Sequence, residues 1–347
     1  MSLVPEDSAL QHERAPRPLP LFLELVRNVA ARDPALARAS LKGLAAYAEA
    51  TRPPPAAPRA EVARIGPATL RDHQGSGPPA VLIPSLINPP SILDLDPDVS
   101  LAAAVARMGR RVLLLDWGAA RDRADLDVTG HVETLLLPLL DALGEPPALI
   151  GYCLGGTMAI AAANVAPVER VATLAAPWHF ARYPDDARAA LAAMWRESRA
   201  TAQLLGALPM EVLQAAFWSL DPQRTVAKFA EFAALEPGSG KACRFVALED
   251  WANEGEPLPF PAARELIEDL FAADRPGQGR WTIGGGAVAD DLPVRTLHFT
   301  AANDRIAPAA TAPAGPAIEI ASGHVGMVVG GKARDTLHAP LANFLRL

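Results

Sequence analysis

The stretch LIGYCLGGTMAI, residues 149–160, constrains the fold more than any other part of the chain. It places Cys153 at the centre of a glycine-flanked turn, after a short apolar run and before a run of small residues at helical spacing. In a sharp strand-to-helix turn the backbone comes so close to the central residue that side chains two positions before and after it would collide. The pattern therefore predicts a nucleophile elbow, G-x-S-x-G with cysteine in place of serine.

Such a turn places the thiol at the N-terminus of a helix, where unpaired amides and the helix dipole favour thiolate over thiol. The alternative interpretation is a structural cysteine buried on a tight turn, because free cysteines are often simply packed. The apolar run before Cys153 and the helical pattern after it favour the elbow.

From residue 80 onward, short apolar runs alternate with amphipathic helical segments. The runs are continuous rather than alternating in polarity, which is typical of a parallel sheet buried on both faces. With the elbow, this predicts an α/β-hydrolase fold: a mostly parallel central sheet with helices on both faces and a mainly helical cap insertion. The predicted strands are residues 80–84, 111–118, 147–151, 170–177, 294–300 and 317–321.

The same pattern predicts four segments along the chain. Residues 1–60 read as an N-terminal helical arm and a linker containing the proline tract TRPPPAAPR, which cannot continue a helix. The hydrolase core is expected in two parts, residues 61–185 and 291–347. Residues 186–290 break the alternation and predict the helical cap insertion, in which CRFVAL, residues 243–248, is a strand candidate.

The partners of an elbow nucleophile follow it in the chain order acid, then histidine. Asp304 lies in the loop after one predicted strand and His324 in the loop after the next, so both fall at carboxyl ends of strands. We predict that His324 takes the proton of Cys153 and later returns it, and that Asp304 fixes the tautomer of His324. Taken singly, Asp304 could equally cap a turn and His324 could be an ordinary loop histidine.

An oxyanion hole is expected from the backbone N–H of the residue after the nucleophile, Leu154, and from a second N–H in the loop after an earlier strand. That loop is PSLIN, residues 84–88. The second donor is therefore predicted to be Leu86 or Ile87.

These motifs resemble the polyhydroxyalkanoate synthases, whose lipase-like box has the form G-x-C-x-G-G, as in GYCLGG. The resemblance covers residues 80–345. It implies a cysteine-dependent acyltransferase that forms ester-linked polymer from 3-hydroxyacyl-coenzyme A and acts as a homodimer or with a partner subunit. Further similar stretches are PSLINPPSILDL (84–95), VLLLDWG (112–118), LEDWANEGEPLP (248–259), ANDRIAP (302–308) and SGHVGMV (322–328).

Sulfur fits this chemistry. Moving an acyl group from a coenzyme A thioester to Cys153 exchanges one thioester for another, and attack by a hydroxyl then runs downhill to an oxoester. A thioesterase or an intracellular polyester depolymerase on the same fold is an alternative, as is an inactive granule-surface scaffold. A transferase must keep water from the acyl-enzyme, and Trp195 and Trp251 in the cap are candidate substrate-binding residues, although such residues more often only pack.

Composition excludes other classes. The net charge of −7 gives no positive field for nucleic acid or an anionic membrane surface, and no segment reaches the roughly 18 apolar residues of a membrane span. Two cysteines are too few for a disulfide framework, and the N-terminus lacks a secretory pattern, so we expect a cytoplasmic protein. No metal-ligand spacing is present, and we expect no bound cofactor, with the coenzyme A thioester acting as substrate.

Overall fold

The computed structural model describes residues 14–53 and 59–346. The chain forms two compact units. We call Met1–Ala57 with Met210–Gly255 the helical unit, and Pro58–Pro209 with Glu256–Leu347 the sheet unit. Residues 54–58 of the predicted proline linker lie outside the described residues.

The units are bounded differently from the four segments expected from the sequence. Residues 210–255, part of the predicted cap, group with the N-terminal helices, while residues 186–209 and 256–290 group with the sheet. The division into arm, cap and two core parts stays a prediction.

The sheet unit is built on an eight-stranded sheet with the order β1-β2-β4-β3-β5-β6-β11-β12. The first two strands form an antiparallel hairpin, β2 pairs antiparallel with β4, and all other neighbours are parallel. The mostly parallel sheet of an α/β-hydrolase fold is therefore confirmed. Its strands are β1 Glu61–Ile65, β2 Ala68–Asp72, β3 Pro79–Ile83, β4 Arg111–Asp116, β5 Ala148–Tyr152, β6 Arg170–Leu174, β11 Arg295–Ala301 and β12 Ala317–Ile320.

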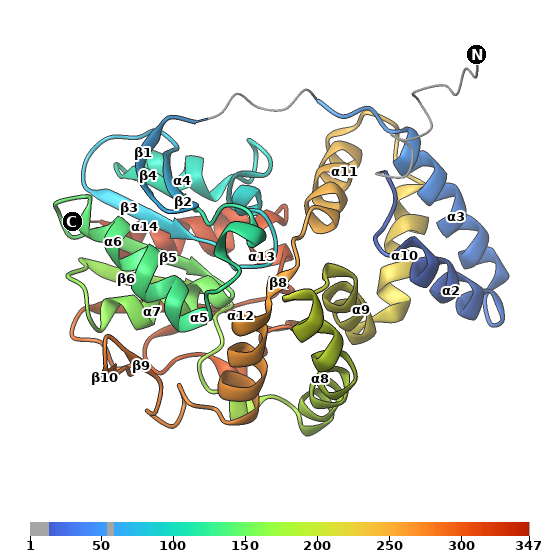
Figure 1. Ribbon diagram of the computed structural model, residues 1–347. Helices are drawn as coiled ribbons and strands as arrows, with labels where there is room; N and C mark the ends of the chain where they lie inside the picture. Colours follow the sequence, from blue (N-terminus) through green and yellow to red (C-terminus); the bar gives the residue numbers. More distant parts are fainter. Residues whose placement is uncertain (1–13, 54–58, 347) are drawn as a thin grey trace, which may run out of the picture. The chain divides into compact units, whose positions relative to one another are not determined.

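Continuous apolar sequence explains the central strands. β3, β5 and β6 are buried along their whole length because helices cover both faces of the sheet (Figure 1). The pairing of Ile83 with Gly151 and of Tyr152 with Leu174 aligns the carboxyl ends of these strands. The loops that follow them consequently begin at one edge of the sheet, where open α/β folds build their sites.

Two groups of helices cover the two faces of this sheet (Figure 1). α7 packs against β5, β6 and the π-helical segment His131–Leu136, whereas α4 packs against β4 and the C-terminal segment Arg334–His338. The helices of the unit are α4 Leu101–Arg107, α5 Val128–Gly130, α6 Leu137–Asp141, α7 Leu154–Ala163, α8 Asp185–Leu205, α12 Phe260–Arg264, α13 Gly326–Val329 and α14 Ala339–Leu345.

Shorter elements complete the sheet unit. 3₁₀ turns lie at Pro90–Asp94, Ala120–Arg123, Phe180–Arg182 and Ala309–Thr311, and a further π-helical segment at Glu265–Ala272. Two small antiparallel pairs join β7 Ala207–Leu208 to β8 Leu258–Pro259, and β9 Thr282–Ile283 to β10 Gly286–Ala287.

Two elements differ from the sequence prediction. The strand expected at residues 243–248 is wrong, because these residues lie inside α11, Gly240–Asn253. The side chains of Ala242, Val246 and Glu249 are buried at helical spacing, and one face of a helix thereby mimics an apolar run. The hairpin of β1 and β2 was not predicted, since β1 is short and carries no fully buried residue.

The helical unit holds α2 Leu19–Ala30, α3 Pro34–Glu49, α9 Met210–Leu220, α10 Pro222–Phe232 and α11. α3 and α10 pack so closely that a Cβ on Gly43 would lie 1.8 Å from the carbonyl oxygen of Phe229. The Ser40 hydroxyl donates to the Val226 carbonyl 3.0 Å away across the same contact. Because these partners are far apart in sequence, the N-terminal helices are an integral part of this unit's core.

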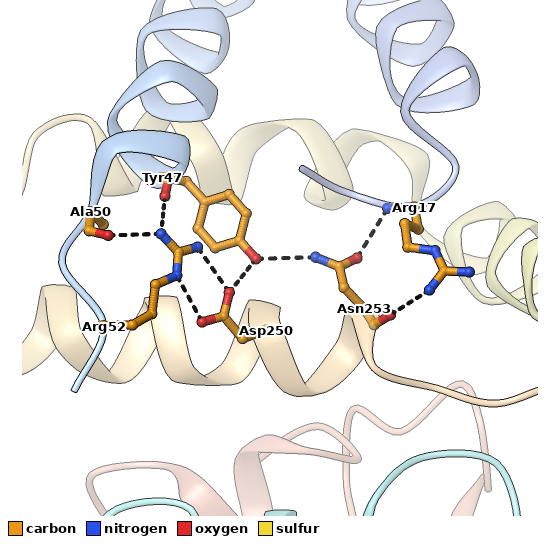
Figure 2. A network of polar contacts seen from close by, with 6 residues as sticks. All are labelled: Arg17, Tyr47, Ala50, Arg52, Asp250 and Asn253. Carbon is orange, nitrogen blue, oxygen red and sulfur yellow. Dashed lines mark hydrogen bonds and ion pairs between the residues drawn. The ribbon is translucent and has the colours of Figure 1, made fainter. Parts of the chain in front are cut away.

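A polar network ties the N-terminal helices to α11 within the helical unit (Figure 2). Arg52 donates to both carboxylate oxygens of Asp250, at 3.0 and 2.9 Å, and the Tyr47 hydroxyl donates to the same carboxylate at 2.6 Å. Asn253 donates from Nδ2 to the Tyr47 oxygen at 3.1 Å and accepts the Arg17 backbone N–H at 3.0 Å. Burial and the neighbouring Asp250 carboxylate raise the pKa of Tyr47, so the phenol stays neutral.

Candidate active site

Cys153 occupies a strained turn between β5 and α7. Its φ of 56° and ψ of −131° fall outside the regions that L-residues ordinarily adopt, and it directly precedes the first helical residue, Leu154. The Cys153 backbone N–H donates to the Leu174 carbonyl at 2.9 Å, which anchors the turn to the neighbouring strand. The cysteine side chain is half-buried.

The glycines of the turn are needed for close backbone approach. A Cβ on Gly151 would lie 2.4 Å from the Cα of Gly156, and one on Gly155 would lie 2.2 Å from the Ile83 carbonyl oxygen. Real Cβ atoms are not found so close to backbone atoms. The second contact also brings the end of β3, and with it the start of the loop 84–88, against the N-terminus of α7.

His324 and Asp304 form a buried pair. The His324 Nδ1 donates to Asp304 Oδ2 at 2.7 Å, while Asp304 Oδ1 accepts the backbone N–H groups of Ile306 and Ala307 at 2.8 Å each. Because β11 and β12 are parallel neighbours, their following loops meet, and the Asn303 N–H donates across them to the Ser322 carbonyl at 2.9 Å.

Cys153 lies close enough to the same histidine to influence its ionisation. Burial by itself disfavours the imidazolium, but the charge of Cys153 and the hydrogen bond to Asp304 outweigh burial and raise the pKa of His324. The three residues predicted from the sequence are therefore brought together in the order thiol, imidazole, carboxylate. Their catalytic roles stay predictions.

Two tyrosines beside the pair were not singled out from the sequence. The ring of Tyr152 lies 5.1 Å from that of His324, and its buried hydroxyl has no hydrogen-bond partner among the described residues. The Tyr183 hydroxyl donates to the Ile306 carbonyl at 2.8 Å, next to the loop that holds Asp304. Burial, and after it the charges of Cys153 and Asp304, raise the pKa of both phenols. The position of Tyr152 directly before the cysteine was the available signal; Tyr183 had none.

The predicted oxyanion donors lie around the elbow. As the first residue of α7, Leu154 has a backbone N–H without an intrahelical acceptor, and within residues 14–53 and 59–346 it donates to no other protein group. Leu86 is buried at 2% exposure in the loop that follows β3, and Ile87 is the next residue of that loop. A developing negative charge on a carbonyl oxygen beside Cys153 would meet such donors.

The chain is similar to several curated proteins that share one name. No protein-family model matches the chain. Two curated proteins to which it is similar are each named poly(3-hydroxyalkanoate) polymerase subunit PhaC. The one from Haloferax mediterranei is 28% identical over 283 residues, 75% of this chain and 56% of that protein. The one from Allochromatium vinosum is 24% identical over 290 residues, 77% of this chain and 80% of that protein.

The chain is a relative of the polyhydroxyalkanoate synthases. The resemblance stated from GYCLGG and its companion motifs is thereby confirmed. The chain spans little more than half the length of the Haloferax relative.

Solved structures similar to the chain include a hydrolase and an esterase. A meta-cleavage product hydrolase from Pseudomonas fluorescens is 16% identical with a TM-score of 0.45, covering 83% of this chain and 97% of that one. An esterase from Thermogutta terrifontis is 15% identical with a TM-score of 0.48, covering 84% and 98%.

The structure shows the surroundings of Trp195, Trp251 and His179. The Trp195 indole donates to Glu268 at 2.8 Å and stacks on Phe260, with ring centroids 6.0 Å apart. Trp251 is 9% exposed in α11 of the helical unit. Substrate binding by either tryptophan stays a prediction. His179, which follows the fourth predicted strand, pairs with Asp290 at 3.0 Å.

Grouped metal ligands and a membrane-spanning helix are both absent from the part of the chain that the structure describes. Among them, no three His, Cys, Asp or Glu side chains are grouped to hold a metal ion. In the same part of the chain, no helix combines the length and apolar character that crossing a bilayer requires.

Proposed function

We propose that the chain is an enzyme, a cysteine-dependent acyltransferase that moves 3-hydroxyacyl groups from coenzyme A to a hydroxyl acceptor, the end of a growing polyester. The observation that carries the proposal is the hydrogen-bonded His324–Asp304 pair near Cys153 on a glycine elbow, in a relative of polyhydroxyalkanoate polymerase subunits. The half-length match to the Haloferax protein leaves activity, substrate and partners as proposals.

The first half of the reaction acylates the enzyme. The Cys153 thiolate attacks the thioester carbonyl, and the resulting oxyanion is held by the Leu154 N–H and a donor of the loop 84–88. The carbon–sulfur bond to coenzyme A then breaks, and the His324 imidazolium gives its proton to the departing sulfur. Asp304 holds Nδ1 of His324, so that Nε2 is the atom that exchanges this proton.

The second half transfers the acyl group. Neutral His324 takes the proton of the acceptor hydroxyl as its oxygen attacks the acyl-cysteine carbonyl. The oxoester is released when the Cys153–acyl bond breaks, and the thiolate is again paired with imidazolium. Water in place of the alcohol turns the same steps into hydrolysis, so exclusion of water decides the product. Assembly as a homodimer or with a partner subunit, and a cytoplasmic location, remain expectations.

Incubation with 3-hydroxybutyryl-coenzyme A, with and without a 3-hydroxybutyrate oligomer ester as primer, tests the proposal. The expected result is release of coenzyme A together with chain-extended ester. Release of coenzyme A with only free 3-hydroxybutyrate would overturn it in favour of the thioesterase or depolymerase alternative. The Cys153→Ala variant should release no coenzyme A, whereas Cys243→Ala, at an exposed cysteine, should behave as the parent. A parent protein without any turnover would favour the inactive scaffold.

A further inference from the structure

The loop 84–88 is held from outside by three hydrogen bonds to its carbonyl groups. The Trp117 indole donates to the Pro84 carbonyl at 3.1 Å, and Arg123 Nη2 donates to the Leu86 carbonyl at 2.9 Å. The backbone N–H of Glu256 donates to the Ile87 carbonyl, also at 2.9 Å. All three donors are in the sheet unit, so the loop is fixed against its own fold.

Arg123 is unusually constrained for an arginine. It is 4% exposed, and besides Leu86 its guanidinium donates to the Gly118 carbonyl at 3.3 Å and contacts His131 Nε2 at 3.1 Å. A charged side chain is rarely buried this deeply unless hydrogen bonds or ion pairs hold it in place. Three bonds in three directions leave the planar fork no freedom to turn.

His131 acts as an acceptor for this arginine. Its Nδ1 donates to the Asp127 carbonyl at 2.6 Å, which leaves the Nε2 lone pair for Arg123. Burial, and with it the charge of Arg123, lower the pKa of His131 to about 4 despite the opposing bond to Asp127. At neutral pH the ring is therefore uncharged, as this arrangement needs. It also meets Trp117 edge-on, with centroids 5.7 Å apart, which links two of the loop's supports.

We infer that Arg123 is a positioning residue that fixes the Leu86–Ile87 peptide so that the Ile87 N–H serves as the second oxyanion donor. In a planar trans peptide, the carbonyl of one residue and the N–H of the next point in opposite directions. With the Leu86 carbonyl held by Arg123, the Ile87 N–H points away from that side chain. The bond from Glu256 to the Ile87 carbonyl fixes the following peptide as well.

This inference decides between Leu86 and Ile87, the two candidate oxyanion donors that the sequence left open. The Leu86 N–H belongs to the peptide of the Ser85 carbonyl, which accepts no hydrogen bond within the described residues. No hydrogen bond holds the carbonyl of that peptide, whereas the carbonyls of the peptides on both sides of Ile87 are each held by one. Preorganised donors cost no reorganisation during reaction, so Ile87 is the better one. The inference rests on the proposed acylation of Cys153, although not on the identity of the acceptor.

The test compares two reactions of the same thiol. Acylation by 3-hydroxybutyryl-coenzyme A passes through an oxyanion, whereas alkylation by iodoacetamide displaces iodide at a saturated carbon and forms none. The Arg123→Lys variant keeps the charge and loses the fork. We expect its first-turnover acylation to fall by about 100-fold, the usual effect of losing one oxyanion donor, while alkylation of Cys153 changes by less than about threefold.

Arg110→Lys is the matched control. Arg110 is also buried, at 1% exposure, and its guanidinium pairs with Glu169 and donates to the Leu345 carbonyl at 2.6 Å. It directly precedes β4 and therefore lies at the amino ends of the parallel strands, away from the elbow. Its ratio of acylation to alkylation should equal that of the parent.

If the Arg123→Lys variant does not fold, a second variant can still test the inference. His131→Phe keeps an aromatic ring against Trp117 and removes the acceptor for Arg123, together with the Nδ1 donor to the Asp127 carbonyl, so acylation should fall by about tenfold with alkylation unchanged. Equal losses of acylation and alkylation in these variants would show a merely structural arginine and overturn the inference, as would unchanged acylation. A parent that is alkylated at Cys153 but never acylated by the thioester would instead refute the proposed function.

Discussion

The carboxylate of Asp304 is divided between His324 and its own loop. Oδ2 accepts from His324 Nδ1 at 2.7 Å, and Oδ1 accepts the backbone N–H groups of Ile306 and Ala307. The loop thereby fixes the rotation of the carboxylate before any substrate arrives. His324 receives its orientation from a group that cannot turn away.

The Asp304→Asn variant should fold as the parent does but lose the correct orientation of His324. The two backbone donors will hold the amide oxygen in place of Oδ1, which turns the amide NH₂ toward His324 and stabilises the wrong tautomer. We expect first-turnover acylation by 3-hydroxybutyryl-coenzyme A to fall by about 10³–10⁴-fold. Asp290→Asn alters the comparable pair with His179, at 3.0 Å, and should change the rate by less than about twofold. Similar losses in both variants would contradict the assignment.

The two free cysteines should differ in reactivity. His324, whose pKa is raised by the charge of Cys153 after the opposing effect of burial, keeps an imidazolium beside that sulfur at neutral pH. Iodoacetamide should therefore alkylate half-buried Cys153 about ten times faster than exposed Cys243 at pH 7, as read by peptide mass spectrometry.

The pH dependence of this reaction provides its control. Because the raised pKa keeps His324 protonated as the pH rises, alkylation of Cys153 should stay nearly constant from pH 6 to 8. The alkylation rate of a short cysteine peptide should increase over the same pH range, because the ordinary pKa of a cysteine thiol is about 8.5. His324→Gln should remove the difference between the protein and the peptide. A Cys153 rate that follows the peptide would contradict the ion pair.

Gly155→Ala tests the close packing at the elbow. The new Cβ would lie 2.2 Å from the Ile83 carbonyl oxygen and 2.6 Å from that of Pro84, so β3 and α7 must move apart. We expect the free energy of unfolding to fall by about 3 kcal/mol, at the upper end of overpacking effects, in urea titrations. Gly331→Ala in the same unit meets nothing within 4 Å and should stay within about 0.5 kcal/mol of the parent.

The sequence predicted those parts of the fold whose signals are local. The spacing of Gly151, Cys153 and Gly155 predicted the elbow because backbone contact there excludes side chains. Strand ends predicted Asp304 and His324, because parallel neighbours deliver their loops to one edge. What spacing left open was the oxyanion donor, since the choice between Leu86 and Ile87 depends on which peptide planes are held.

Long-range packing was invisible in the sequence. The contact between Ser40 and Val226 joins segments 186 residues apart, and nothing local indicates that an N-terminal helix completes the core of an insertion. In the sequence AARDRADLD, Arg123 is one of several charged residues and resembles a solvent-exposed turn residue. Only the structure shows that its side chain is buried, at 4% exposure. Residues 243–248 were misassigned because an apolar helix face and a short strand look alike over six positions.

Tyr47→Phe should weaken the helical unit in a pH-dependent manner. The phenol donates to Asp250 and accepts from Asn253, so its removal should cost about 1–2 kcal/mol at pH 8. Burial and Asp250 raise the pKa of Tyr47 above the unfolded value of about 10. Its contribution is therefore fully present below pH 10 and is lost as the pH rises further, because the unfolded state then releases a proton that the folded state retains.

The gap in stability between parent and variant should accordingly narrow from pH 10 upward. Urea titrations can measure this difference in the free energy of unfolding within the helical unit. The readout is pulse proteolysis by subtilisin, in which fragments from α3 and α11 are counted. Tyr183→Phe, a matched change in the sheet unit, should leave these fragments unaffected. A gap that stays constant up to pH 11 would mean that Tyr47 ionises without strain, and the network of Figure 2 would then not depend on a neutral phenol.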